Sequence, residues 1–89
     1  MNAIQILCNG TMKAAILVLD HNGVDLKKVD AAKLSEDLRK TLKEEIQNVL
    51  GEWQDAVEAN LDELWLREFM NAQCNIIALK ALKNGGWFQ

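Results

Sequence analysis

The chain has 89 residues, of which 49% are apolar and 26% are charged, and its formal net charge is −3. This balance disfavours intrinsic disorder and is typical of a globular protein, so we expect residues 1–89 to fold as a single domain. The sequence has no Pro and only five Gly, and it therefore lacks the turn residues on which β-sandwiches and barrels depend.

Charge is distributed unevenly along the chain. Residues 44–68 carry eight carboxylates against the single cation Arg67, whereas the preceding stretch, residues 27–43, is mildly basic. A long acidic region repels phosphate, so we expect no nucleic-acid partner.

The two cysteines, Cys8 and Cys74, are far apart in sequence and form neither a disulfide framework nor a metal-ligand spacing. A reducing, cytoplasmic location is the simplest interpretation. The short apolar run at residues 14–19 has no basic segment before it and no cleavage pattern after it, so it fits a signal peptide poorly. Asn9, Gly10 and Lys13 interrupt the most apolar region, and we expect no membrane association.

Residues 3–19 fit two structures. The helical one places eight residues on one face, all apolar except Thr11: Ile4, Leu7, Cys8, Thr11, Met12, Ala15, Ile16 and Leu19. The alternative is a β-hairpin that turns at Asn9-Gly10. In that pairing Ile6 would oppose Lys13, which leaves neither face cleanly apolar. We therefore favour the helix.

The next break is at residues 20–23, Asp-His-Asn-Gly, where we expect a loop. Residues 24–30 are ambiguous, and Asp30 or Ser35 is expected to cap the following helix. That helix carries an apolar line in steps of nearly always four residues: Leu34, Leu38, Leu42, Ile46, Val49, Trp53, Val57 and Leu61. Such a line winds around a straight helix, because each step overshoots the helical period by about 40°. A break or bend is therefore predicted, at Gly51 first and at Asn60 second.

Residues 61–82 form the last predicted helix, and apolar side chains surround it on every side. A chain this short leaves part of such a helix uncovered, so we expect a second copy to cover the rest. Asn71, Gln73 and Asn75 interrupt this helix, and they either face water or pair across an interface. Trp87 and Phe88 end the chain behind Gly85-Gly86, and they either fold back onto the core or anchor in a neighbouring molecule.

No residue pattern predicts catalysis. His21 is the only histidine, and its pairing with Cys8 or Cys74 as a nucleophile and base is the enzymatic alternative. A solvated histidine and two buried cysteines are the favoured interpretation. The acidic pairs lack the histidine partners of helical metal sites, and no phosphate-binding loop is present, so we expect neither a metal nor a cofactor.

The sequence therefore predicts a mainly α fold, a small bundle of three to four helices, with a β-hairpin packed on two or three helices as the α+β alternative. The predicted function is a non-catalytic helical protein–protein interaction module that forms a homodimer. The first alternative is a small acidic inhibitor or regulator that binds a basic surface of another protein, and the second is an enzyme that uses His21. The expected interface residues are Trp65, Phe69, Ile76, Ile77, Trp87 and Phe88.

Overall fold

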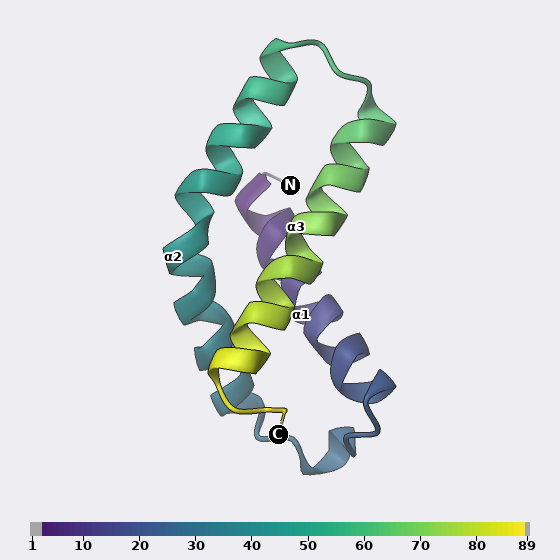
Figure 1. Ribbon diagram of the computed structural model, residues 1–89, viewed down its shortest axis with the longest axis vertical. Coiled ribbons are helices and arrows are strands. Elements are labelled where there is room, and N and C mark those ends of the chain that lie inside the picture. The colour runs from purple at the N-terminus through teal and green to yellow at the C-terminus, as the bar shows by residue number, and fades with distance from the viewer. Residues whose placement is uncertain (1–2, 89) are drawn as a thin grey trace.

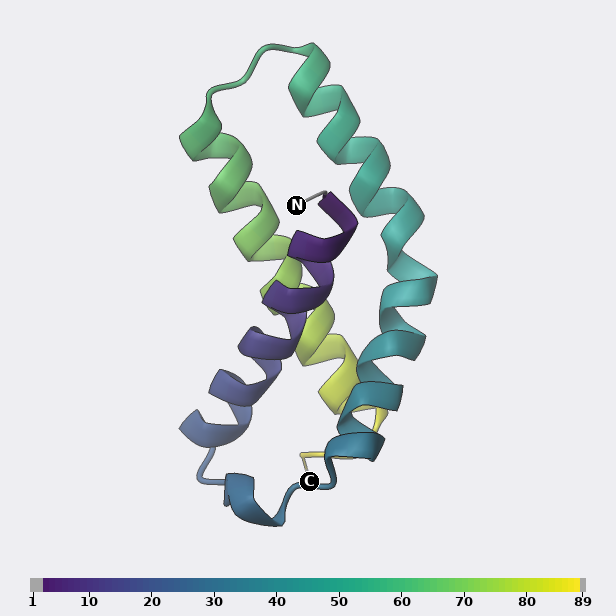
Figure 2. The ribbon, with the colours of Figure 1, turned by 180° about the vertical axis from the view of Figure 1, so that it is seen from behind.

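A computed structural model describes residues 3–88, and over that range it contains three α-helices, one short 3-10 turn and no strand. The helices are α1 (Ala3–His21), α2 (Ala31–Glu58) and α3 (Glu63–Asn84), and the 3-10 turn η1 (Leu26–Lys28) lies between α1 and α2. α3 packs along both other helices, which contact one another less (Figures 1 and 2). The predicted helical bundle is confirmed, and the hairpin alternative is not supported.

Asn9 and Gly10 lie inside α1 instead of forming a hairpin turn. Gly10 is needed there because a Cβ at this position would collide with the Sγ atom of Cys74 on α3. The glycine therefore serves close packing of two helices. The buried face of α1 consists of Leu7, Thr11, Ala14, Ala15 and Leu19.

The predicted apolar face of α1 is only partly correct. Ile4 and Ile16 are 46% and 38% exposed, whereas Thr11, the polar exception in the prediction, is completely buried. Its hydroxyl donates a hydrogen bond to the carbonyl oxygen of Leu7 at 2.6 Å, which offsets the loss of hydration. α1 is also long and apolar enough to cross a membrane, judged by length and composition alone. The expectation of no membrane association stays a prediction.

α2 begins after Asp30, whose carboxylate accepts hydrogen bonds from the backbone N–H groups of Ala32 and Lys33. The predicted break at Gly51 is wrong, because α2 continues through this residue to Glu58. A glycine inside a helix costs only about 1 kcal/mol, which the flanking helix formers offset. The second choice, Asn60, is where the chain turns: its φ is +56°. α3 starts after Asp62, whose carboxylate accepts a 2.7 Å hydrogen bond from the N–H of Trp65.

The apolar line of α2 winds out of the core along the helix. Leu34, Leu38 and Val49 are buried, whereas Val57 is 47% exposed and Leu61, which lies in the turn after α2, is 39% exposed. Figures 1 and 2 show the reason: the α2–α3 hairpin extends beyond the start of α1, so that no third helix covers its turn. The molecule is accordingly elongated, with extents of 43 × 24 × 22 Å.

The C-terminal residues fold back onto the start of α2. The indole N–H of Trp87 donates a hydrogen bond to Oδ2 of Asp37 at 2.8 Å, and Lys33 Nζ lies 2.8 Å from the same oxygen and 4.6 Å from the Trp87 ring centroid. Hydrogen bonds from Lys33 and Trp87 lower the pKa of Asp37 below its ordinary value. Trp87 and Phe88 are half-buried against the core. Of the two alternatives for this segment, the structure therefore shows the folded-back one, and a part for the exposed portions of Trp87 and Phe88 in an intermolecular interface stays a prediction.

Candidate interaction surface

The face of α3 that points into the bundle carries one apolar stripe. Met70, Cys74, Ile77 and Ala81 follow one another in steps of four, three and four residues, and each is at most 4% exposed. We call this set the inner stripe. α1 and α2 cover it completely, so it forms the centre of the core.

A second apolar stripe lies on the opposite face of α3. It consists of Trp65, Phe69, Ala72, Ile76 and Leu79, in steps of four, three, four and three residues, and we call it the outer stripe. Residues in a helix are about 100° apart, so Ala72 lies about 160° around the axis from Cys74 of the inner stripe. Alternating steps of three and four are the heptad spacing with which helices pair in coiled coils.

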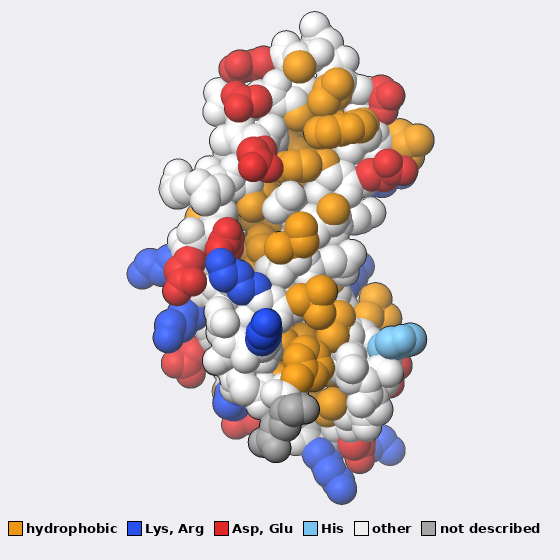
Figure 3. Space-filling model, viewed as in Figure 1, with side chains coloured by type: hydrophobic (Ala, Val, Ile, Leu, Met, Phe, Trp, Pro, Cys, Tyr) orange, Lys and Arg blue, Asp and Glu red, His pale blue; other side chains and the backbone are white. Residues whose placement is uncertain are grey.

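The outer stripe is exposed along its length. Trp65 is 44% exposed, Ile76 is 56% exposed and Leu79 is 48% exposed. Ala72 is also exposed, and Phe69 is half-buried. Figure 3 shows apolar side chains running along the face of the molecule on which α2 and α3 lie in front. A continuous apolar band of this kind is uncommon on soluble monomers and marks an interaction site.

Aromatic rings order the end of the outer stripe that is next to the α2–α3 turn. The rings of Trp65 and Phe69 stack with their centroids 5.7 Å apart and their planes 8° apart. Trp53 of α2 lies with its ring centroid 6.4 Å from that of Phe69. These contacts fix large side chains in place before a partner arrives, which lowers the entropy that binding would otherwise cost.

Charge is segregated along the long axis of the molecule. Residues 44–68, which end α2, form the turn and start α3, have a net charge of −7, whereas the rest of the chain has a net charge of +4. Figure 3 shows acidic side chains around the apolar band at the α2–α3 turn end and lysine and arginine side chains nearer the other end. On α3 itself, Glu63 and Glu68 are near one end, which Asp62 caps, and Lys80 and Lys83 are near the other.

Three of the predicted interface residues, Trp65, Phe69 and Ile76, lie together on the outer stripe. Ile77 is a correction, because it is 1% exposed and belongs to the inner stripe. Sequence analysis missed Ala72 and Leu79 as members of the outer stripe. Their heptad spacing from Trp65 was a signal that could have identified them.

The three amides in α3 lie outside the core. Asn71 and Asn75 are exposed and Gln73 is half-buried. Helical geometry places them beside the outer stripe, with Gln73 on one flank and the two asparagines on the other. They are available to water or to a partner.

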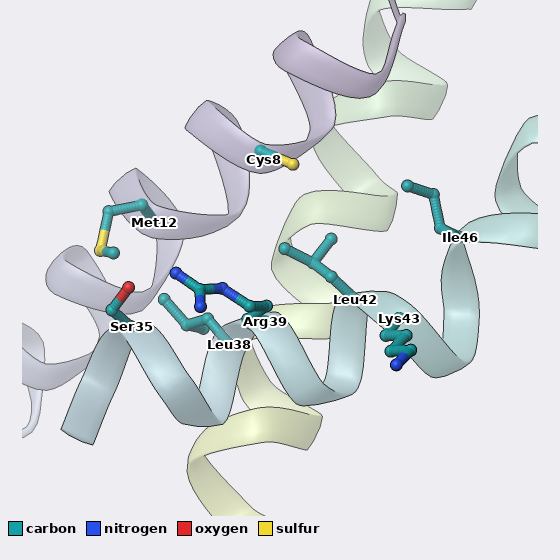
Figure 4. Close-up of a pocket in the computed structure, with 8 residues that line it drawn as sticks. All are labelled: Cys8, Met12, Ser35, Leu38, Arg39, Leu42, Lys43 and Ile46. Atoms are coloured by element: carbon teal, nitrogen blue, oxygen red, sulfur yellow. The ribbon is translucent and has the colours of Figure 1, made fainter. Parts of the chain in front are cut away.

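A separate groove with a volume of about 470 Å³ lies between α1 and α2 (Figure 4). Its floor is largely apolar, and Arg39 and Lys43 are its cations. The lining residues are Cys8, Met12, Ser35, Leu38, Arg39, Leu42, Lys43 and Ile46. Neither a carboxylate nor an imidazole lines this groove, so its residues include no general base paired with the Cys8 thiol.

The structure does not bring the histidine and the cysteines together. Cys8 and His21 are on the same helix, 13 residues and hence about 20 Å apart. Cys74 is buried against the start of α1, with its Sγ atom 3.6 Å from the carbonyl oxygen of Leu7, and burial raises the pKa of its thiol. Among residues 3–88, no three His, Cys, Asp or Glu side chains gather in a way that could hold a metal ion.

Comparison with protein-family models, with curated proteins and with solved structures finds no match to this chain. Its function must therefore be inferred from its own residues and their arrangement.

Proposed function

We propose that the protein is a non-catalytic helical interaction module that forms a homodimer through the outer stripe of α3. One observation carries this proposal: α3 has a heptad stripe of which every member except the half-buried Phe69 is exposed, although its opposite face is already filled by the protein's own core. Burial of an apolar stripe between two helices is the main source of stability in coiled coils.

The size of the molecular surface supports the proposal. The chain exposes 6266 Å², whereas a compact monomer of 10.0 kDa exposes about 5,200 Å². The radius of gyration is 13.7 Å, against about 12 Å for a compact domain of this length. A second copy could cover part of the excess, and a twofold dimer needs only one self-complementary surface.

The proposal is tested with two matched substitutions of exposed isoleucines. Ile76→Glu places a charge in the outer stripe, and Ile4→Glu places the same charge on α1, where Ile4 is 46% exposed. We expect the wild type and the Ile4→Glu variant to sediment as dimers at micromolar concentration and the Ile76→Glu variant to sediment as a monomer. Circular dichroism should show that all three are equally helical. If Ile76→Glu sediments like the wild type, the outer stripe is not the interface.

A second candidate function is capture of a basic protein surface. The observation in its favour is the net charge of −7 on residues 44–68, a segment that also includes the exposed side chains of Val57 and Leu64. Such a complex would associate rapidly and would weaken steeply with added salt. Self-association through the outer stripe depends mainly on apolar burial and is less sensitive to salt. A titration with salt therefore separates the two functions.

A cytoplasmic location is part of the same proposal. Cys8 and Cys74 are both free thiols, and a reducing compartment keeps thiols unpaired.

A further inference from the structure

We infer that the second copy lies antiparallel to the first, with the twofold axis of the dimer passing beside Ala72. This inference rests on the proposed function and adds the orientation and register of the two α3 helices. It is argued from the sizes and the charges of the side chains on and beside the outer stripe.

Side-chain size is arranged symmetrically about Ala72. Phe69 precedes Ala72 by three residues and Ile76 follows it by four, while Trp65 and Leu79 are each seven residues away. In an antiparallel pair, Phe69 therefore meets Ile76 of the second copy, and Trp65 meets Leu79 of the second copy. Each large aromatic ring packs on an aliphatic side chain, and the small Ala72 residues at the axis let the helices approach closely.

A parallel pair would give a less even interface. Trp65 would then meet Trp65 at one end and Leu79 would meet Leu79 at the other, so the bulky indole pair would hold the helices further apart at the Trp65 end. Ala72 meets Ala72 in both orientations and does not distinguish them. Interfaces pack best where large and small side chains alternate across them.

Charge favours the same orientation. An antiparallel pair places Asp62, immediately before the start of α3, beside Lys80 and Lys83 of the second copy. Glu63 lies on the opposite face of α3, where it pairs with Arg67 of its own chain. Lys80 already pairs with Glu45 of its own chain, whereas Lys83 has no ion pair among residues 3–88. A parallel pair would place the two acidic ends together, and like charges would repel.

The flanks of the outer stripe fit the antiparallel register as well. In an antiparallel pair, each flank of the outer stripe faces the corresponding flank of the second copy. Asn75 then lies opposite Glu68 of the second copy, where an amide can donate a hydrogen bond to a carboxylate. On the other flank, Gln73 lies beside Gln73 of the second copy, close to the axis, and the two amides can pair.

Cysteine cross-linking tests the orientation. The background is Cys8→Ser, because Cys8 is the exposed native thiol, whereas the buried Cys74 stays. In this background, Phe69→Cys and Ile76→Cys are oxidised with diamide, separately and as an equimolar mixture in which one variant carries a longer tag. We expect the mixture to give a disulfide-linked heterodimer and each variant alone to give at least tenfold less dimer. Ala72→Cys is the positive control, since residue 72 meets itself in either orientation.

The outcomes separate this inference from the proposed function. If Ala72→Cys cross-links, and Phe69→Cys and Ile76→Cys each cross-link to themselves, the dimer is parallel: the proposed function stands and the inference is overturned. If Ala72→Cys does not cross-link and the wild type sediments as a monomer, the proposed function itself fails.

A surface charge gives a second measurement that leaves the apolar stripe intact. Lys83→Glu removes the cation that faces the acidic end of the second copy, so the dissociation constant of an antiparallel dimer should rise about fivefold. In a parallel dimer Lys83 would lie beside lysines of the second copy, and the same change would not weaken binding. An unchanged or lower dissociation constant would therefore contradict the antiparallel orientation.

Discussion

The two long faces of α3 carry apolar residues at the same heptad spacing, yet only one of them is buried. α1 and α2 cover the inner stripe, whose residues are at most 4% exposed, while Trp65, Ile76 and Leu79 of the outer stripe are between 44% and 56% exposed. A chain of 89 residues has enough helix to cover one face of α3 but not both. Periodicity therefore shows that a helix face needs a partner, but it does not show whether that partner belongs to the same chain.

The largest expected difference between the two faces is at adjacent residues, Ile77 and Ile76. Ile77→Ala opens a cavity in the core and should lower the free energy of unfolding by about 3 kcal/mol. Ile76→Ala removes only exposed surface and should change the stability of the monomer by less than about 0.5 kcal/mol. Urea denaturation followed by circular dichroism, at a concentration low enough to populate monomer, measures both. If Ile76→Ala and Ile77→Ala lowered the free energy of unfolding equally, the two faces of α3 would not differ in burial as described.

Two glycines inside helices, Gly10 and Gly51, allow a further comparison of a packed helix face with an open one. Gly10 of α1 lies against Cys74 of the inner stripe, so Gly10→Ala should destabilise the fold by about 2 kcal/mol through overpacking. Gly51 lies inside α2 with open space around it, so Gly51→Ala should stabilise the fold by about 1 kcal/mol. Thermal unfolding of the two variants measures whether each change lowers or raises the stability of the fold. A destabilised Gly51→Ala variant would mean that α2 does not run straight through this residue.

The smallest expected effect concerns the C-terminal residues, which belong to the chain's own fold. Asp37→Asn weakens the contacts with Lys33 and Trp87 and should lower the stability of the fold by about 1 kcal/mol at neutral pH. Self-association should not change, because Asp37 is on α2 and not on the outer stripe. Sedimentation of the variant checks this, and dimer loss would mean that Trp87 takes part in the interface.

The contribution of Asp37 should also depend on pH. Its pKa is lowered in the folded protein, so its contribution is fully present above the unfolded pKa of about 3.8. The contribution disappears as pH falls through the folded pKa. Urea denaturation of the wild type and of Asp37→Asn should therefore give stabilities that differ at neutral pH and converge in acid. A difference that persists or grows in acid would contradict the lowered pKa.

The sequence predicts the helices well because their signals are local. The apolar spacing of residues 3–19 and the capping residue Asp30 depend only on near neighbours. The break at Gly51 was wrong because a single glycine weakens a long helix without ending it, whereas Asn60 adopts a positive φ that does end it.

The candidate site was harder to predict, because it depends on which helices meet. Ile76 and Ile77 are adjacent and equally apolar. Only the packing of α1 and α2 on α3 shows that Ile77 is buried in the core and that Ile76 is exposed. The position of Trp87 depends on Lys33 and Asp37, which are 54 and 50 residues away in sequence. Contacts at such separations leave no periodic pattern in the sequence.

Sedimentation equilibrium of the unmodified protein over a range of concentrations tests the central claim most directly. If the outer stripe is an interface between two copies, the average mass should rise from 10.0 kDa at low concentration to twice that value at high micromolar concentration. A folded protein whose mass stays at 10.0 kDa over the whole range would contradict the claim, and would mean that the exposed stripe of α3 serves another partner or none.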